Sequence, residues 1–204
     1  MIVVFEGLDT SGKSTQINKV KDYLSYKGFS ILTLKDPGST DVGEKIRSIL
    51  LDPNNNISNK TEALLFAAAR QQMIDECILN NDLSDTILLL DRFIDSSIVY
   101  QSIARNLDEM YILEINKSAL KSVNVDLKVY MRLTLEEYIH RQRKIKDRME
   151  QIDNEVIHTM IAKYDQMYLD KPNVVTVDAT DDIDSNTKLI SANIISRLII
   201  SKLS

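Results

Sequence analysis

The chain has 204 residues and a net charge of −5, and 44% of its residues are hydrophobic and 27% are charged. This composition is typical of a globular protein, and the length favours one domain over residues 1–204. The negative net charge gives no electrostatic reason to expect nucleic-acid binding, and no apolar run approaches the roughly 20 residues that span a membrane.

A glycine-rich segment follows the first apolar run of the chain. Residues 2–5 predict a strand, and residues 16–26 predict a helix because their apolar side chains recur at helical spacing. Between them, residues 7–14 contain a glycine, four further residues and then Gly-Lys-Ser, which is the spacing of a phosphate-binding loop. Backbone N–H groups of such a loop surround a phosphate. A glycine-rich turn that binds nothing is the alternative, and the strand–loop–helix setting disfavours it.

Short apolar runs alternate with helical patterns along the whole chain. Strands are predicted at residues 2–5, 31–35, 86–91, 125–131 and 174–177. Helices are predicted at residues 16–26, 41–51, 61–79, 108–121, 154–168 and 183–203. This alternation favours a doubly wound α/β fold, with a five-stranded parallel sheet covered by helices on both faces. Since nucleotides bind beyond the carboxyl ends of such strands, polar residues at those ends are the candidates for a site.

The turn after the second predicted strand is the first of these candidates. Residues 36–38 are Asp-Pro-Gly, which end the strand, and the helix that follows carries Arg47. A plain turn and a surface helix are the alternative interpretation.

The helix predicted from residue 61 carries a possible base-binding pair. Ser58 or Asn59 can cap it, with Glu62 as the capping partner. Phe66 and Arg70 lie four residues apart and therefore share a face. A ring beside a guanidinium can stack on a base and bond its edge. A core phenylalanine and a solvated arginine are the alternative.

The third predicted strand ends in Asp91 and Arg92. An acid at this position beside a phosphate loop can hold Mg²⁺ directly or through water, and the guanidinium offers two parallel donors to a phosphate. A salt bridge at the strand end is the alternative. Farther on, Ser97 and Gln101 lie four residues apart on a predicted helix, with Tyr100 beside them. A hydroxyl and an amide there suit a polar base edge, and the ring suits a sugar.

A basic segment follows the fourth predicted strand. Thr134 can cap a short helix whose end carries cations, namely His140, Arg141, Arg143, Lys144, Lys146 and Arg148. One interpretation is a solvated charged face. The other is a short helical lid over about 140–150, which brings cations to phosphates during transfer. The last strand leads into residues 178–180, a loop that can flank a base.

Together these segments resemble a thymidylate kinase of the bacterial type, a family of P-loop nucleoside monophosphate kinases. The resemblance extends from residue 5 to residue 180. The segments that carry it are residues 6–15, 36–38, 64–70, 91–101 and 147–148. Many NTPases share the phosphate loop, whereas Phe66 and Arg70 combined with residues 91–101 are far more specific.

The resemblance implies transfer of the γ-phosphoryl group of ATP to dTMP, with Mg²⁺ as the cofactor. The implied ATP-binding residues are Gly7, Leu8, Asp9, Thr10, Ser11, Gly12, Lys13, Ser14 and Thr15. The implied metal ligands are Ser14 and Asp91. The implied dTMP-binding residues are Asp9, Lys35, Pro37, Arg47, Phe66, Arg70, Arg92, Ser97, Tyr100 and Gln101. The implied catalytic residues are Asp9, Lys13, Arg92, Arg143 and Arg148.

Individual roles follow from the same resemblance. Phe66 is expected to stack on thymine, and Arg70 is expected to bond O4. Ser97 and Gln101 are expected at N3, and Tyr100 is expected to close on the deoxyribose and disfavour a 2′-hydroxyl. The remaining arginines, Arg47 and Arg92, are expected to hold the acceptor phosphate.

The sequence departs from the family pattern at several positions. Some members carry an arginine inside the phosphate loop at the position of Thr10. Because threonine is uncharged, the resemblance implies that cations of the lid neutralise the negative charge of the transferring phosphate instead. Arg148 is the first candidate for that role and Arg143 the second. Lys35 stands where an arginine is usual, which weakens a bidentate phosphate contact, and Ser39 replaces a usual glycine.

Two alternative functions remain open at this point. One is another pyrimidine nucleotide or deoxynucleoside kinase on the same scaffold. The other is a regulatory P-loop NTPase without a small-molecule acceptor, which would need partner-facing loops that respond to hydrolysis. The residues expected on the acceptor side count against the second alternative.

The remaining expectations concern partners and compartment. Cys77 is the lone cysteine, which excludes an internal disulfide and a cysteine-rich zinc site and fits a reducing compartment. The chain begins with a strand that leads directly into the loop, so we expect a cytoplasmic protein. The expected partners are ATP and dTMP, with no nucleic acid and no membrane, and the resemblance implies a homodimer.

Overall fold

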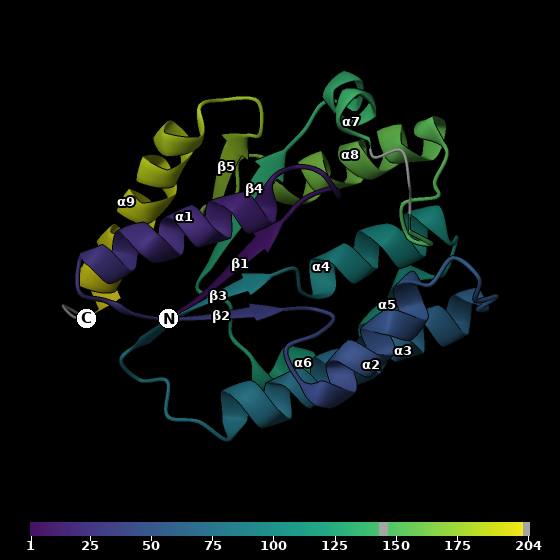
Figure 1. Ribbon diagram of the computed structural model, residues 1–204, viewed down its shortest axis with the longest axis horizontal. Coiled ribbons are helices and arrows are strands. Elements are labelled where there is room, and N and C mark those ends of the chain that lie inside the picture. Colours follow the sequence, from purple (N-terminus) through teal and green to yellow (C-terminus); the bar gives the residue numbers. More distant parts are fainter. Residues whose placement is uncertain (143–146, 202–204) are drawn as a thin grey trace.

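Parallel strands form the centre of the molecule (Figure 1), whose computed structural model describes residues 1–142 and 147–201. In these residues the sheet has five strands in the order β2-β3-β1-β4-β5. The strands are β1 (Ile2–Glu6), β2 (Ser30–Lys35), β3 (Thr86–Asp91), β4 (Leu127–Arg132) and β5 (Val174–Asp178). All of their pairings are parallel. The predicted sheet is confirmed, with boundaries that differ from the sequence-based ones by at most two residues.

Helices cover both faces of the sheet. They are α1 (Lys13–Tyr26), α2 (Asp41–Leu51), α3 (Asn59–Met73), α4 (Ile94–Ser97), α5 (Glu109–Ile115), α6 (Lys117–Ser122), α7 (Leu135–Arg141), α8 (Asn154–Tyr168) and α9 (Ile183–Ser201). Two π-helices, η1 (Ile74–Leu79) and η2 (Ile98–Ala104), continue α3 and α4. Figure 1 shows α1 and α9 beside one face, while α2, α3 and α5 gather on the other side.

The core follows from the alternation of side chains along the strands. In β1, Val3 and Phe5 pack with Val20 of α1 and Ile190 of α9. The residue between them, Val4, points to the opposite face and packs with Met73 at the end of α3. Successive side chains of a strand point to opposite faces, so a strand covered on both sides is apolar throughout.

A third buried cluster joins the sheet to the segment after β3. The rings of Tyr130 in β4 and of Tyr164 and Tyr168 in α8 have centroids 5.2 to 6.0 Å apart. Val99 of η2 packs into the same cluster. The cluster fixes η2 against α8, and η2 carries residues of the candidate site.

Three predicted helices differ from the structure. The single helix predicted over 108–121 is wrong, because it breaks at Asn116, whose side-chain amide donates to the Ile112 carbonyl oxygen at 2.8 Å. Asparagine side chains compete with helical hydrogen bonds in this way. The helices predicted after residue 61 and around residues 97–101 both widen into π-helices, which occur often at functional sites.

The predicted lid is only partly described. Helix α7 ends at Arg141, and a turn at residues 147–150 follows residues 143–146, which lie outside the described part. In this turn the backbone N–H of Arg148 donates to the Leu51 carbonyl oxygen at 3.2 Å. Arg143, Lys144 and Lys146 lie outside the described residues. No helix among the residues that the structure describes is long and apolar enough to cross a membrane.

Candidate active site

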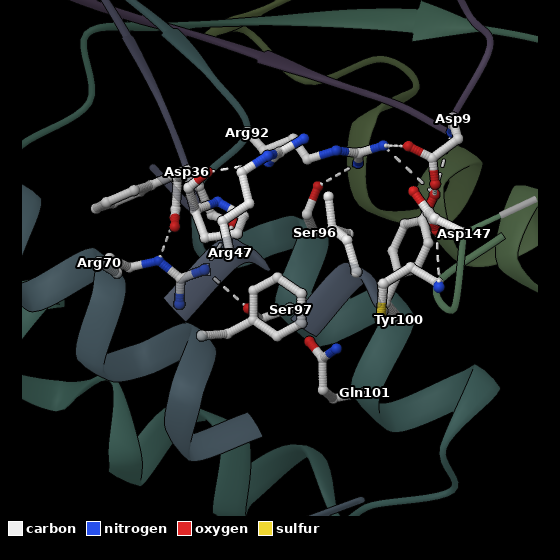
Figure 2. A pocket seen from close by; sticks show the side chains of 15 residues that line it. Asp9, Asp36, Arg47, Arg70, Arg92, Ser96, Ser97, Tyr100, Gln101 and Asp147 are labelled. Atoms are coloured by element: carbon white, nitrogen blue, oxygen red, sulfur yellow. Dashed lines mark hydrogen bonds and ion pairs between the residues drawn. The ribbon is translucent and has the colours of Figure 1, made fainter. Parts of the chain in front are cut away.

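Two adjoining pockets open at the carboxyl edge of the sheet, where β1, β2 and β3 end side by side. Asp91 at the end of β3 pairs with Phe5 of β1 and with Lys35 of β2. The deep pocket is lined by Asp9, Asp36, Pro37, Arg47, Leu51, Phe66, Arg70, Arg92, Phe93, Ser96, Ser97, Tyr100, Gln101, Asp147 and Met149 (Figure 2). The loop pocket is lined by Asp9, Thr10, Gly12, Lys13, Ser14, Thr15, Lys35, Asp36, Arg47, Asp91, Arg92, Asp147 and Glu150. The lining of the deep pocket, which combines apolar and aromatic side chains with polar groups, suits a small ligand.

The loop between β1 and α1 has the backbone that a phosphate-binding loop requires. Gly7 has φ 140°, and a Cβ there would lie 2.6 Å from the Met131 carbonyl oxygen. Gly12 has φ 87° and directly precedes α1, so the helix N-terminus faces the loop pocket. Only glycine tolerates such φ values without strain. The loop geometry therefore explains why these two positions are glycines.

Lys13 is the buried cation of this loop. Its Nζ donates to the carbonyl oxygens of Leu8 at 2.7 Å and Gly7 at 3.2 Å. Burial, together with the nearby positive charge of Arg92, lowers the pKa of Lys13 to about 8. A phosphate beside Nζ would favour the charged form again.

Arg92 joins the two pockets. Its guanidinium donates to Asp9 Oδ1 at 2.6 Å (Figure 2). The backbone of Arg92 has φ 70°, and the guanidinium also donates to the Gly7 carbonyl oxygen at 2.8 Å. The Tyr100 hydroxyl donates to the other oxygen of Asp9 at 2.7 Å. Burial alone would raise the pKa of Asp9, but the charges of Arg92 and Lys13 lower it to about 2. Asp9 is therefore a carboxylate at neutral pH.

A buried acidic side chain at the end of β1, that of Glu6, supports Arg92 through Ser96. Glu6 accepts from the backbone N–H of Phe93 at 2.9 Å and from the Ser96 hydroxyl at 2.5 Å. Arg92 in turn donates to the Ser96 hydroxyl oxygen at 2.7 Å. Burial and the charge of Asp95 raise the pKa of Glu6 to about 7, although Arg92 opposes the shift.

Ser14 and Asp91 provide a pair of oxygen ligands at the loop pocket. The Ser14 hydroxyl donates to Asp91 Oδ2 at 2.9 Å, and both residues line that pocket. Hard oxygen ligands in small number suit Mg²⁺, which keeps several waters and binds substrate phosphates. The residues present therefore fit this ion. Among the described residues, no group of three or more His, Cys, Asp or Glu side chains forms a metal site of protein ligands alone.

The deep pocket gathers the residues expected around a base. Phe66, Arg70, Ser97, Tyr100 and Gln101 all line it. Arg70 is only 1% exposed, so the alternative of a solvated arginine is wrong.

Three side chains hold the Arg70 guanidinium in place. Its Nε donates to Asp36 Oδ2 at 2.5 Å, and its Nη2 donates to the Ser97 hydroxyl oxygen at 2.8 Å. Its Nη1 donates to the Asn116 side-chain oxygen. Asp36 and Ser97 appear with Arg70 in Figure 2. The arginine is thus pre-oriented toward the pocket.

The two arginines expected at the acceptor phosphate, Arg47 and Arg92, line both pockets. Arg47 Nη1 donates to the Pro37 carbonyl oxygen at 3.0 Å. Lys35 lines only the loop pocket, where its Nζ lies 3.1 Å from Glu44 Oε1. Pro37 lines only the deep pocket.

Arg148 does not lie with Arg47, Arg92 and Lys35 at the pockets. Its Nη1 lies 2.6 Å from Glu62 Oε2, and its Nε donates to the Leu50 carbonyl oxygen at 2.7 Å. It lines a separate surface groove rather than either pocket. A role on the transferring phosphate would require this side chain to leave Glu62. The other expected lid arginine, Arg143, lies outside the described residues.

A third pocket borders the phosphate loop on its other side. It is lined by Ser11, Gly12, Thr15, Gln16, Met131, Arg141, Ala179, Thr180, Asp181, Ile183 and Asn186. Arg141 Nη2 donates to the Ala179 carbonyl oxygen at 3.0 Å. The loop after β5, which the sequence suggested could flank a base, lies in this pocket.

Sequence reasoning missed several residues that support the site. Glu6 and Asn116 are buried in the support of Arg92 and Arg70, and Asp147 lines both pockets. Glu62 was expected as a capping partner, but Ser58 caps α3 and Glu62 is buried in ion pairs. The first turn of α3 reads Asn-Lys-Thr-Glu, so the local sequence carried no signal that Glu62 would be buried.

A thymidylate kinase family model matches residues 5–190 of the chain. The thymidylate kinase of Acholeplasma laidlawii is 40% identical over 205 residues, which covers 97% of this chain and 100% of that protein. The thymidylate kinase of Thermoanaerobacter sp. (strain X514) is 46% identical over 149 residues, which covers 72% of this chain and 73% of that protein. That of Caldanaerobacter subterraneus is 38% identical over 190 residues, with 92% and 91% covered.

Proposed function

The chain belongs to the thymidylate kinase family, and from this premise we propose that it transfers the γ-phosphoryl group of ATP to dTMP, giving ADP and dTDP. The observation that carries the proposal is the meeting of two pockets at Asp9 and Arg92. One pocket has the phosphate loop with Lys13, and the other has Phe66 and Arg70. Such an arrangement holds two nucleotides with their phosphates facing each other.

The donor ATP binds along the phosphate loop, residues 7–15. Backbone N–H groups and the N-terminus of α1 receive its phosphates, and Lys13 exchanges its carbonyl partners for phosphate oxygens. The adenine ring fits the pocket beside Arg141 and Thr180, since a guanidinium plane can stack on a base.

Ser14 and Asp91 hold Mg²⁺ in this proposal. The ion supplies positive charge to the donor phosphates, which carries much of the electrostatic stabilisation in phosphoryl transfer. The loop pocket needs that charge, because carboxylates line it as well as cations. The carboxylates are Asp9, Asp36, Asp91, Asp147 and Glu150, and the cations are Lys13, Lys35, Arg47 and Arg92.

The acceptor dTMP binds in the deep pocket. Phe66 stacks on thymine, Arg70 donates to O4, and the Ser97 and Gln101 side chains lie toward N3. Tyr100 packs against the deoxyribose, where a 2′-hydroxyl would be disfavoured. The pocket is lined by all five of these residues, and the fixed orientation of Arg70 supports its assigned contact.

The chemical step depends on positioning and charge. Arg92, Arg47 and the nearby Lys35 and Pro37 position the acceptor phosphate, and Asp9 orients Arg92 through a contact of 2.6 Å. Cations on a transferring phosphoryl group typically contribute about 10²-fold or more to the rate. We assign Lys13 and Arg92 to this role, and a lid arginine, Arg143 or Arg148, to the closed state.

We extend the proposal to one domain, a homodimer and a cytoplasmic compartment. The large apolar side chains of Ile49 in α2 and Leu64 in α3 are 44% and 50% exposed, and these two helices pack side by side. Light scattering on the purified protein tests the dimer, since a monomer at micromolar concentration contradicts it.

The decisive experiment measures ADP release with ATP, Mg²⁺ and a panel of monophosphates containing dTMP, dUMP, dCMP and dGMP. The proposal expects the highest kcat/KM with dTMP and negligible ADP release without a monophosphate. Lys13→Ala is the matched control and should remove most turnover while the protein still unfolds cooperatively. ADP release that needs no acceptor would support a regulatory NTPase instead.

A further inference from the structure

Gln101 presents a fixed amide to the deep pocket. Its Nε2 donates to Glu62 Oε1 at 2.9 Å. Its Oε1 is buried and has no hydrogen-bond partner within the part of the chain that the structure describes. Gln101 is only 1% exposed. It lines the deep pocket, and Figure 2 shows its side chain there. A buried acceptor without a partner beside a pocket indicates a ligand group that donates to it.

The chemistry of Glu62 dictates this orientation. An ionised carboxylate only accepts hydrogen bonds, so the amide nitrogen of Gln101 has to face it. A flipped amide would bring two acceptor oxygens together inside the protein and lose the bond. The glutamine oxygen therefore has to point away from Glu62.

Glu62 forms ion pairs with two arginines. It is fully buried, and Arg105 Nε lies 3.0 Å from its Oε2 while Arg148 Nη1 lies 2.6 Å from the same oxygen. A buried charge persists in a protein when it is paired and hydrogen-bonded in this way. The two arginines come from the end of η2 and from the turn at 147–150, so they converge on Glu62 from different segments.

We infer that Glu62 is a positioning residue for base selection: it makes Gln101 present an acceptor, so that the site takes a pyrimidine with a hydrogen on N3. This inference rests on the proposed function. Thymine and uracil carry N3–H and donate to Gln101 Oε1. Cytosine has a lone pair at N3, which would face the glutamine oxygen and leave both acceptors unpaired.

The Arg70 guanidinium also favours thymine over cytosine, through the group at position 4 of the ring. Its donors suit the O4 carbonyl of thymine and oppose the N4 amino group of cytosine. Gln101, oriented by Glu62, thus contributes one of two discriminating contacts. A site built around fixed polar groups rejects an analogue with the wrong pattern because those groups are left unpaired.

The orientation of the Gln101 amide is tested by whether substrate selectivity rises or falls when the side chain is removed. The ratio of kcat/KM for dTMP to that for dCMP is measured in the wild type and in Gln101→Ala. If the oxygen faces the base, the ratio falls about tenfold or more, because dTMP loses an acceptor and dCMP loses a repulsion. A ratio that rises means that the amide nitrogen faced the base, and it overturns the inference without any variant of Glu62.

The role of Glu62 is tested with Glu62→Gln. A glutamine there can donate to Gln101 Oε1, so the Gln101 amide is free to turn, and the dTMP/dCMP ratio should fall about tenfold. In a Gln101→Ala background the same change should alter the ratio less than about threefold, because the two residues act as one unit. Equal losses for dTMP and dCMP would show a merely structural role and overturn the inference.

The matched control is Glu109→Gln. Glu109 pairs with Lys163 at 2.7 Å, neither residue lines either pocket, and the Glu109 side chain is 43% exposed. This variant should leave the ratio unchanged. The KM for ATP and the melting temperature are measured throughout. A wild type that does not phosphorylate dTMP overturns the proposed function together with the inference, whereas an active wild type with an unchanged Glu62→Gln ratio overturns the inference alone.

Discussion

At Lys13 a positive charge is buried among carbonyl oxygens of its own loop. Lys13 therefore has two protonation states that differ in their ability to bind phosphate. With its proton, the ammonium binds phosphate oxygens. Without its proton, it offers them no charge. Its pKa of about 8, lowered by burial and by Arg92, brings the change into an accessible pH range.

We expect ATP to bind Lys13 with uptake of a proton at pH 8.5. Phosphate charges favour the ammonium, so the pKa of Lys13 rises on binding and the affinity falls as pH increases above about 8. Calorimetry in two buffers of different ionisation enthalpy measures the uptake. Lys13→Met is the control, and proton uptake of the same size in that variant would contradict this assignment.

Glu6 gives the folded protein a pH dependence of its own. Its pKa rises from 4.5 in the unfolded chain to about 7, through burial and then the charge of Asp95. Between these values the folded state binds more protons than the unfolded state, so the free energy of unfolding falls as pH increases. The stabilising contribution is fully present below pH 4.5 and is lost as pH rises through about 7. Its upper bound is about 3 kcal/mol, since one pKa unit corresponds to about 1.4 kcal/mol.

Glu6→Gln isolates this contribution, because a glutamine has nearly the same shape and does not titrate. The variant should lack the wild-type loss of stability between pH 5 and pH 8. Urea unfolding at several pH values measures both curves. Parallel curves for the two proteins would show that Glu6 is ionised in the folded state throughout.

At the scale of elements, α2 and the turn before it form one unit with little free space. Thr40 caps α2 by accepting from the Gly43 N–H at 2.9 Å. A Cβ on Gly43 would lie 2.7 Å from the Gly38 carbonyl oxygen. Arg47, one turn farther along α2, donates to the Pro37 carbonyl oxygen. The close approach at Gly43 thus fixes where Arg47 meets the pockets.

Gly43→Ala tests whether this close packing outweighs the higher helix propensity of alanine. Alanine is the better helix former by about 1 kcal/mol in an exposed position, but here its Cβ would displace the turn or α2. We expect KM for dTMP to rise about tenfold, with a smaller change for ATP, because Arg47 moves with the helix. Steady-state kinetics measure both constants. Val42→Ala, at a neighbouring position that is 46% exposed, is the control and should leave both unchanged.

How far the sequence predicted these elements depends on the range of the interactions. The strands and the phosphate loop follow from local periodicity and spacing, and the sheet confirms the strands. Phe66 and Arg70 share a helix face, so their convergence on one pocket was also local information. The partners of Arg70 were not, because Asp36 and Asn116 are 34 and 46 residues away along the chain. Burial of Glu62 likewise depends on arginines that only the tertiary fold brings near.

At the scale of the whole molecule, the two nucleotides would meet at groups that belong to both pockets. Asp9, Arg47 and Arg92 line both of them. The protein as a whole carries a net charge of −5, and both proposed substrates are anions. The shared arginines therefore have to neutralise two sets of phosphates at once, and carboxylates beside them reduce their effect.

From this charge balance we predict that a divalent ion determines whether bound ATP weakens the binding of dTMP. In EDTA, a non-hydrolysable ATP analogue should weaken dTMP binding at least about threefold, because like charges share Arg47 and Arg92. With Mg²⁺ the weakening should disappear, since the ion that Ser14 and Asp91 are proposed to bind would add a compensating charge at the loop pocket.

Calorimetric titration of dTMP into the protein, with and without the ATP analogue, measures this coupling, and coupling between two binding sites is reciprocal. The reverse titration should therefore give the same factor. Asp91→Asn keeps the shape of the side chain while removing its charge, so Mg²⁺ should restore dTMP binding less completely in that variant. Equal dTMP affinity in EDTA and in Mg²⁺, with the analogue bound in both, would mean that the protein cations alone balance the phosphates and that no metal is needed at Ser14 and Asp91.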